Sequence, residues 1–113
     1  MLAIALVSCT RTKAEHAAPA ELLYTSPFFV KAKQYACSHS DRWFVVSAKH
    51  GLVSPEEVLE PYDFSLSDIP PEGLKGWAKS VWSALDRRLG AQEAEVTMLY
   101  QVAFIKILIY APS

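Results

Sequence analysis

The sequence predicts an α/β domain of three layers, in which a mainly parallel central sheet is flanked by helices. Two short, continuously apolar runs, Leu2 to Val7 and Trp43 to Val46, are typical of strands that are buried on both faces. Helical patterns separate these runs from each other and from a third apolar run. This β-α-β-α-β order favours parallel strands that are joined by right-handed crossovers.

The first helix is expected to begin at Ser26 and Pro27, an N-cap residue followed by proline at the first helical position. Before it, residues 8–25 are polar and then rich in alanine, with Pro19 as a break. The helix should fade near residues 38–40. Its buried face is predicted from apolar residues at helical spacing: Phe28, Phe29, Ala32, Tyr35 and Ala36.

A second strand is expected over Trp43 to Ser47, and Gly51 can supply the turn after it. Residues 53–71 form a long connection that contains four prolines, and connections of this length in a compact domain are often functional. Within it, we expect one helical turn at Pro55 to Leu59.

The second helix should open at Asp68 to Pro71 and end at Gly90, a natural C-terminal stop. Glu95 to Tyr100 is expected to form the third strand, whereas Val102 to Tyr110 is compatible with either a helix or a strand. The buried face of the second helix is predicted to contain Leu74, Trp77, Ala78, Val81, Leu85 and Leu89.

The composition limits which classes of protein the chain can belong to. The chain has 113 residues, of which 51% are hydrophobic, so we expect one folded domain over residues 1–113. The net charge of −1 gives no overall basic field, although the more basic first half of the chain includes two polar motifs. The two cysteines, Cys9 and Cys37, indicate reduced thiols and a cytoplasmic location. The N-terminal apolar run is too short for a signal peptide, and no stretch is long enough to span a membrane.

The two polar motifs follow the first two strands directly. They are Ser8-Cys9-Thr10-Arg11-Thr12-Lys13 and Ser47-Ala48-Lys49-His50-Gly51-Leu52. Because ligands of open α/β sheets bind outside the carboxyl ends of the strands, we expect both motifs to line one crevice. Residues 8–18 contain no glycine, which excludes a Walker loop and a dinucleotide fingerprint. Cys-x-x-Cys and His-x-x-x-His pairs are absent from the sequence, so no metal or other cofactor is expected.

Several side chains of the motifs have both a chemical and a structural interpretation. Cys9 is either a nucleophile activated by a nearby cation or a small buried hydrophobic residue. His50 is either a general acid or base near neutral pH or a loop histidine that caps a carbonyl. Ser47 can cap its turn, and Lys49 can bind phosphate as a point charge. Asp63 can activate water or steady a developing cation, or it can be an exposed turn former.

Four motifs together resemble a known family. They are Ser-Cys-Thr-x-x-Lys at 8–13, Leu-Tyr-x-Ser-x-x-Phe at 23–29, Ser-Ala-Lys-His-Gly-Leu at 47–52 and Pro-Tyr-Asp at 61–63. A mostly uncharacterised family of small bacterial and phage proteins carries Ser-Cys-Ser/Thr-x-x-Lys, Leu-Tyr-x-Ser, Ser-Ala-Lys-Tyr/His-Gly-Leu and Pro-Tyr-Asp in the same order. More distantly, the chain is similar to the YaaA peroxide-stress proteins and to a domain of archaeosine synthase.

These relatives imply a fold akin to uracil-DNA glycosylase and work on nucleic acid or modified bases. Carried over by motif, the resemblance implies seven substrate-binding residues: Ser8, Cys9, Lys13, Tyr24, Ser26, Ser47 and Tyr62. Of these, Ser8 and Ser47 are expected to contact the edge of the base. The candidates for catalysis are Lys49, His50 and Asp63.

The leading hypothesis for function is cleavage of an N-glycosidic bond at a modified base in DNA. Such an enzyme must extrude the base or accept a single strand. Lys13 and Lys49 would hold backbone phosphates, while Asp63 or His50 would position water. Two alternatives stay open: a non-catalytic nucleic-acid-binding or stress-response module, and a small-nucleotide enzyme that hydrolyses or transfers a phosphoribosyl group.

The C-terminal segment departs from the family pattern. Family members commonly continue with another helix and strand, whereas residues 100–113 here are apolar and end early. We therefore expect a missing C-terminal element and an open sheet edge, which would favour a homodimer. The other expected partner is DNA or a modified nucleobase or nucleotide, and no membrane partner is expected.

Overall fold

The computed structural model describes residues 2–90, 92–100 and 103–109, so part of the ambiguous segment Val102 to Tyr110 lies outside the described residues. The elements, in chain order, are β1 (Leu2–Ser8), β2 (Ala18–Pro19), α1 (Ala20–Leu23), α2 (Pro27–His39), β3 (Arg42–Ser47), β4 (Gly51–Val53), β5 (Val58–Leu59), the 3-10 helix η1 (Leu66–Asp68), α3 (Pro71–Leu89), β6 (Ala94–Tyr100) and β7 (Ala103–Ile109).

The main sheet is mixed, with a parallel centre. Its strand order is β4-β3-β1-β6-β7. The first strand, β1, pairs in parallel with both β3 and β6, as the β-α-β-α-β order predicts. The outer strands β4 and β7 are antiparallel to their neighbours, and the short strands β2 and β5 form a second, separate sheet. The ambiguous C-terminal segment is thus a strand where the structure describes it.

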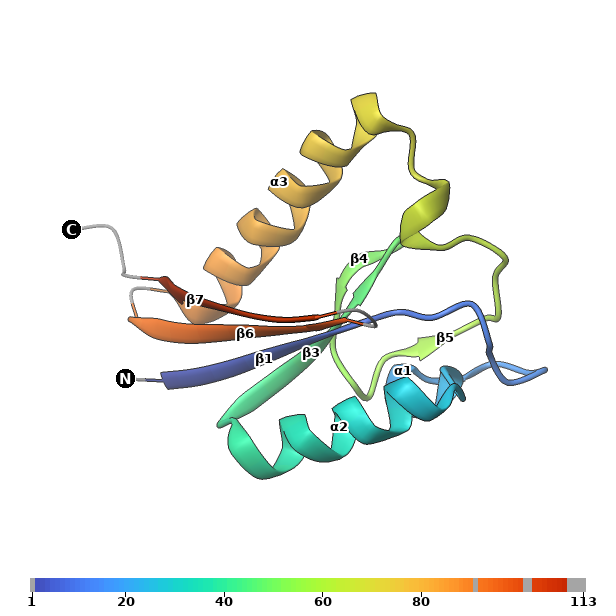
Figure 1. The fold of residues 1–113 in the computed structure, drawn as a ribbon, viewed down its shortest axis with the longest axis horizontal. Coiled ribbons are helices and arrows are strands. Elements are labelled where there is room, and N and C mark those ends of the chain that lie inside the picture. Colours follow the sequence, from blue (N-terminus) through green and yellow to red (C-terminus); the bar gives the residue numbers. More distant parts are fainter. Residues whose placement is uncertain (1, 91, 101–102, 110–113) are drawn as a thin grey trace.

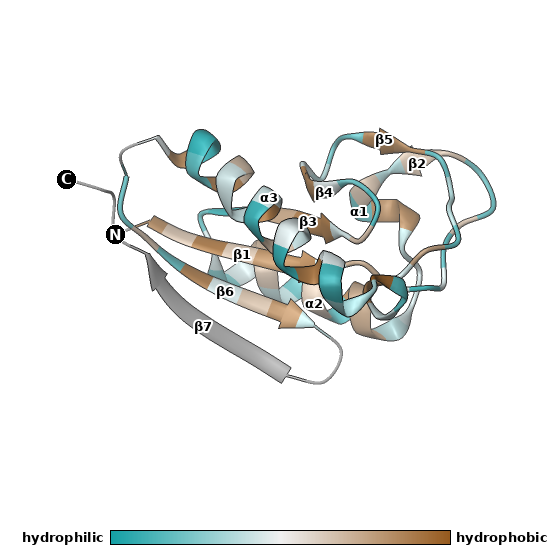
Figure 2. Cartoon of the chain, turned by 90° about the horizontal axis from the view of Figure 1, so that it is seen from above, coloured by the Kyte–Doolittle hydropathy of each residue, from teal (hydrophilic) through white to brown (hydrophobic). Residues whose placement is uncertain are grey.

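Helices cover the two faces of the sheet, which gives the predicted three-layer α/β architecture (Figure 1). Alternate residues of β1 point to opposite layers. Ala5 and Val7 pack in the cluster that contains Phe29 of α2, whereas Ile4 and Leu6 pack in the cluster that includes the buried face of α3. The hydropathy colouring shows that β1 is mostly apolar, whereas α3 carries many hydrophilic residues (Figure 2). The prediction that β1 is buried on both faces is confirmed.

The helix boundaries follow local sequence signals. Ser26 caps α2, because its Oγ accepts a hydrogen bond from the backbone N–H of Phe29 at 3.2 Å. The second long helix, α3, begins at Pro71 and ends at Leu89, and the φ of 63° at the following Gly90 lies in the region that favours glycine. No helix within the described residues is long and apolar enough to cross a membrane.

Two details of the predicted elements are wrong. Pro55 to Leu59 is not helical: a turn closed by the Glu57 N–H and the Ser54 carbonyl at 3.0 Å leads into β5, which pairs with β2. Pairing with a distant segment therefore outweighs the local helical pattern. Tyr35 and Leu74, predicted on buried faces, are 39% and 42% exposed. The first turns of α3 rise away from the sheet, which leaves Leu74 without a surface to cover (Figure 1).

Candidate functional site

The two polar motifs meet at the carboxyl ends of β1 and β3. The chain leaves β1 toward α2 on one face of the sheet and leaves β3, through β4, toward α3 on the other face. Ligands of α/β sheets bind outside the carboxyl ends of the strands, which is where both motifs lie. The Cys9 N–H donates to the Val46 carbonyl at 2.9 Å, and the Ala48 N–H contacts the Cys9 Sγ at 3.3 Å. The motifs are therefore neighbours, as the sequence predicts.

Tyr62 lies at the centre of this crevice. Its hydroxyl hydrogen-bonds with the Ser47 Oγ at 2.7 Å and the Tyr24 hydroxyl at 2.5 Å. The Ser47 Oγ also accepts the backbone N–H groups of Lys49 at 3.2 Å and His50 at 3.0 Å. Because these two bonds use both lone pairs of Ser47, its proton goes to Tyr62, whose own proton then goes to Tyr24. Burial raises the pKa of both tyrosines, so the chain of hydroxyls stays neutral.

Three nitrogen-bearing side chains surround the Tyr62 ring. The Nζ atoms of Lys13 and Lys49 lie 4.3 Å and 5.7 Å from the ring centroid. The His50 ring meets it edge-on, with centroids 5.4 Å apart. Lys13 is positioned by an antiparallel β-bridge between its backbone and Tyr24. We call these residues the Tyr62 cluster: Lys13, Tyr24, Ser47, Lys49, His50 and Tyr62.

The environment also lowers the pKa of two basic members of the cluster, Lys13 and His50. Burial lowers the pKa of Lys13, and the nearby Arg11 charge lowers it further, while Cys9 and Asp63 act in the opposite direction. Burial and the Lys49 charge lower the pKa of His50 below its usual 6.5, against an opposing effect of Glu57. His50 is therefore neutral at pH 7 and able to accept a proton.

Asp63 does not join the cluster as a buried carboxylate. Its side chain is 91% exposed, and its Oδ1 pairs with Arg11 Nη1 at 3.1 Å. The other guanidinium nitrogen of Arg11 contacts Asp68 Oδ2 at 3.0 Å and Ser65 Oγ at 2.8 Å. Arg11 thus holds the segment from residue 63 to residue 68 across the end of the sheet.

Two cavities flank this segment. One, of about 400 Å³, is lined by Ala48, Lys49, Tyr62, Asp63 and Phe64. The other, of about 390 Å³, is lined by Ser8 to Arg11, Ser65 to Ser67 and Tyr100. Ser8 continues the alternation of Ile4 and Leu6 and so belongs to the α3 layer, whereas Cys9 packs in the α2 layer. The predicted site is therefore divided between two compartments, with Ser8 apart from the Tyr62 cluster.

Cys9 and Ser26 occupy structural positions. Cys9 is 7% exposed, and its sulfur accepts the Ala48 N–H, which fits the interpretation as a small buried residue. The Ser26 hydroxyl caps α2 and also donates to the Thr10 Oγ1 at 3.2 Å. Both residues help to fix the positions of the loops, and Cys9 also lines the cavity that Ser8 borders.

Sequence reasoning missed three supports of the site. The first is Arg11, which anchors the segment at 63–68. Ser65 and Asp68 form a capping box, which the spacing Ser-x-x-Asp could have indicated. The Trp77 Nε1–H donates to the Ser47 carbonyl at 3.1 Å, a contact with no sequence signal. Within the described ranges, no three His, Cys, Asp or Glu side chains gather to hold a metal ion.

Comparisons with known proteins define the family but not the activity. No solved structure matches the chain. A stretch of 54 residues, 47% of the chain, is 37% identical to the "Uncharacterized protein YfjM" of Bacillus subtilis (strain 168) and spans 36% of that protein's length. A family model described as "Family of unknown function (DUF6884)" matches residues 4–113. The chain therefore belongs to this family of unknown function.

Proposed function

We propose that the Tyr62 cluster binds the phosphate of a nucleotide or of a single nucleic-acid strand, and that the protein hydrolyses the N-glycosidic bond of a modified base held there. The observation that carries the proposal is the approach of two lysine ammonium groups to one tyrosine ring, at 4.3 Å and 5.7 Å from its centroid. These groups lie at the crevice where α/β sheets bind ligands.

The charges of the cluster favour an anion. Neither Lys13 nor Lys49 forms an ion pair within the described residues, and the nearby carboxylate of Asp63 is engaged by Arg11. Two ammonium groups beside one ring repel each other, so a group with two or more anionic oxygens between them lowers the electrostatic energy. Phosphate has this chemistry, and lysine is a common phosphate ligand.

The motif resemblance supports a nucleobase as the rest of the ligand, and with it a fold akin to uracil-DNA glycosylase. The net charge of −1 favours a small footprint, because extensive binding of duplex DNA usually requires a basic face. A nucleotide, or one extruded base with an adjacent phosphate, fits this restriction.

The proposed chemistry is hydrolysis by an activated water. Neutral His50 accepts a proton from water as the water oxygen bonds to C1′ of the sugar and the C1′–N bond breaks. The bonding electron pair leaves with the base, which takes up a proton from solvent. Asp63, which lines the same cavity as Lys49 and Tyr62, stabilises the positive charge that develops on the sugar.

A second candidate function is binding without chemistry. It is favoured by the exposure of Asp63, because a carboxylate that is 91% exposed and paired with arginine is a weak partner for a developing cation. In this case Lys13 and Lys49 would hold the same ligand, and His50 would be dispensable.

The two functions are separated by measuring release and binding on the same substrates. Single-stranded oligonucleotides that contain uracil, hypoxanthine or 8-oxoguanine are incubated with the protein, and free base is quantified by mass spectrometry. For hydrolysis, His50→Gln should lower release by at least about 100-fold while the Kd stays nearly constant. Lys75→Ala, at an exposed position on α3, is the matched control for Lys13→Ala and Lys49→Ala.

The outcomes have distinct meanings. Release that depends on His50 supports the enzyme. Salt-sensitive binding that Lys13→Ala weakens, without any release, supports the binding module. Absence of both release and binding, at low salt and across these substrates and the corresponding nucleotides, contradicts both functions.

A further inference from the structure

The outer edge of β3 has a gap at the opposite end of the strand from Ser47. The strand β4 pairs with β3 only as far back as Val45↔Val53. Two residues further along this register, Pro55 would lie opposite Trp43. Proline has no N–H to donate, and the Pro55 carbonyl instead accepts the Glu21 N–H at 2.9 Å. The ladder therefore stops before it reaches Trp43.

The backbone of Trp43 is left facing this gap. Val46 points its carbonyl toward β1, where it accepts the Cys9 N–H. Because backbone groups alternate in direction along a strand, the N–H and C=O of Trp43 face the opposite side, away from β1. No strand in the described part of the chain pairs with β3 at this position. An edge donor and acceptor of this kind are a template for another strand.

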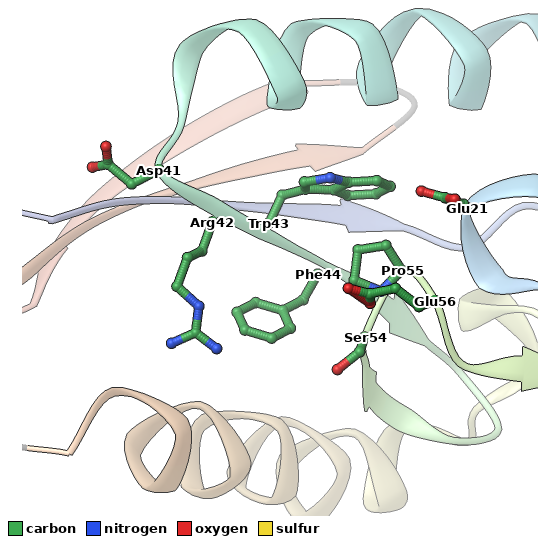
Figure 3. Close-up of a pocket in the computed structure, with 8 residues that line it drawn as sticks. All are labelled: Glu21, Asp41, Arg42, Trp43, Phe44, Ser54, Pro55 and Glu56. Atoms are coloured by element: carbon green, nitrogen blue, oxygen red, sulfur yellow. The ribbon is translucent and has the colours of Figure 1, made fainter.

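A cavity of about 300 Å³ lies at the gap (Figure 3). Trp43 and Phe44 belong to the core clusters on opposite faces of the sheet, so they border the cavity from its two sides. In Figure 3 the Trp43 ring extends to the side of Glu21, whereas the guanidinium of Arg42 points the other way. A strand entering here would meet backbone in the middle and aromatic side chains on either side.

The charge of the cavity indicates what kind of strand it fits. Three carboxylates line it, those of Glu21, Asp41 and Glu56, and none forms an ion pair with the described residues. One cation, Arg42, also lines the cavity, and its guanidinium donates to the Arg88 carbonyl, while the neighbouring Lys33 donates to the Glu21 carbonyl. The Asp41 carboxylate accepts the Ala3 N–H at 2.7 Å, which leaves Glu21 and Glu56 as the acidic groups most available to a ligand.

We propose that this gap binds an extended, basic segment of a partner protein, which adds a short strand to the edge of β3. Main-chain hydrogen bonds to the N–H and C=O of Trp43 provide the pairing. Lysine or arginine side chains of the segment lie toward Glu21 and Glu56 and set the preference for a basic sequence.

The test uses the full chain and a probe peptide, acetyl-Val-Lys-Val-Lys-Val-amide, with NMR detection of backbone amide exchange. At a peptide concentration ten times the Kd, exchange of the Trp43 amide should slow about tenfold. A Glu-for-Lys analogue of the peptide should bind more weakly. An analogue N-methylated at the central valine should lose the effect, because it cannot complete the backbone pairing.

Protein variants test the charge argument. Glu21→Gln and Glu56→Gln should each weaken the lysine peptide by about two- to fivefold, the range expected for one exposed charge pair. Glu72→Gln, an exposed substitution in the first turn of α3, is the matched control and should leave the Kd unchanged.

Four results would overturn the proposal. They are unchanged exchange at Trp43 with the lysine peptide, equal slowing by the acidic peptide, equal slowing by the N-methylated peptide, and slowing that appears without peptide as the protein concentration rises. The last result, together with a dimer in sedimentation, would assign the edge to a second copy of the chain instead.

Discussion

Removal of the Tyr62 hydroxyl is the sharpest test of how the crevice is built. Tyr62→Phe keeps the ring that Lys13 and His50 contact but deletes the oxygen that joins Tyr24 and Ser47. Those two residues are 1% and 0% exposed, so water has little access to replace the lost bonds. The substitution therefore leaves two buried hydroxyl groups without their partner.

The loss in free energy of unfolding depends on the hydrogen bonds that the Ser47 and Tyr24 hydroxyl groups keep. A buried hydroxyl that loses its partner costs about 1–3 kcal/mol. Ser47 still accepts two backbone N–H groups, so its loss falls at the low end, whereas no other hydrogen bond of the Tyr24 hydroxyl is present among the described residues. We expect Tyr62→Phe to lower the free energy of unfolding by about 2–4 kcal/mol.

Urea denaturation measures this change, with Tyr24→Phe and the double variant completing a cycle. With an m-value of about 2 kcal/mol/M, the midpoint for Tyr62→Phe should fall by about 1–2 M at constant m. The cycle should give a coupling energy of about 1–2 kcal/mol between the two tyrosines. A destabilisation below about 0.5 kcal/mol, or strictly additive single substitutions, would refute the hydroxyl chain.

Three further predictions concern the segment at 63–68, the helix end and the histidine. Arg11→Gln should change the free energy of unfolding by less than about 1 kcal/mol, because the ion pairs of Arg11 are exposed. Amide exchange across residues 63–68 should nevertheless accelerate, and unchanged exchange would contradict the anchoring role of Arg11. Gly90→Ala should destabilise the protein by about 1 kcal/mol or more, because φ is 63° at this position. Gly76→Ala lies within the helix, with open space around the added methyl group, and should stabilise the protein by up to about 1 kcal/mol. Thermal unfolding measures both changes, and equal effects would contradict the assignment of the helix end. The pKa of His50 is lower in the folded chain than in the unfolded chain, so the unfolded chain binds the proton more readily. The stability contributed by neutral His50 is therefore present above pH 6.5 and is lost as the pH falls through 6.5 toward the lower folded pKa. His50→Gln should remove this part of the pH dependence of stability, and an unaltered pH profile would contradict the lowered pKa.

The fold was predictable where one local signal dominates. The apolar run at Leu2 to Val7 and the Ser26-Pro27 cap both predict elements that the structure contains, because burial on both faces and capping leave direct marks in the sequence. The short strands β2, β4 and β5 carry no such mark. They depend on pairing between distant segments, as at Ala18↔Leu59, which overrides the helical pattern at Pro55 to Leu59.

The grouping of the motif residues at one end of the sheet was predictable, but their arrangement there was not. Strand-end position brings Ser47 and Lys13 near each other, since the carboxyl ends of parallel strands share one edge. Strand alternation places Ser8 on the other face of the sheet, which the spacing from Ile4 and Leu6 could have indicated. The exposed ion pair between Arg11 and Asp63 joins residues 52 positions apart, and the spacing within the motifs does not encode it.

The proposed function depends most on the binding of one phosphate by both Lys13 and Lys49. Calorimetric titration of the protein with uridine 5′-monophosphate tests it, using Lys13→Ala, Lys49→Ala and the double variant, with Lys75→Ala as control. If the ammonium groups share the phosphate, each single substitution should weaken binding by about tenfold, and the double variant should depart from additivity by at least about 0.5 kcal/mol. Full additivity, or the same Kd in all variants, would contradict a shared site at Tyr62.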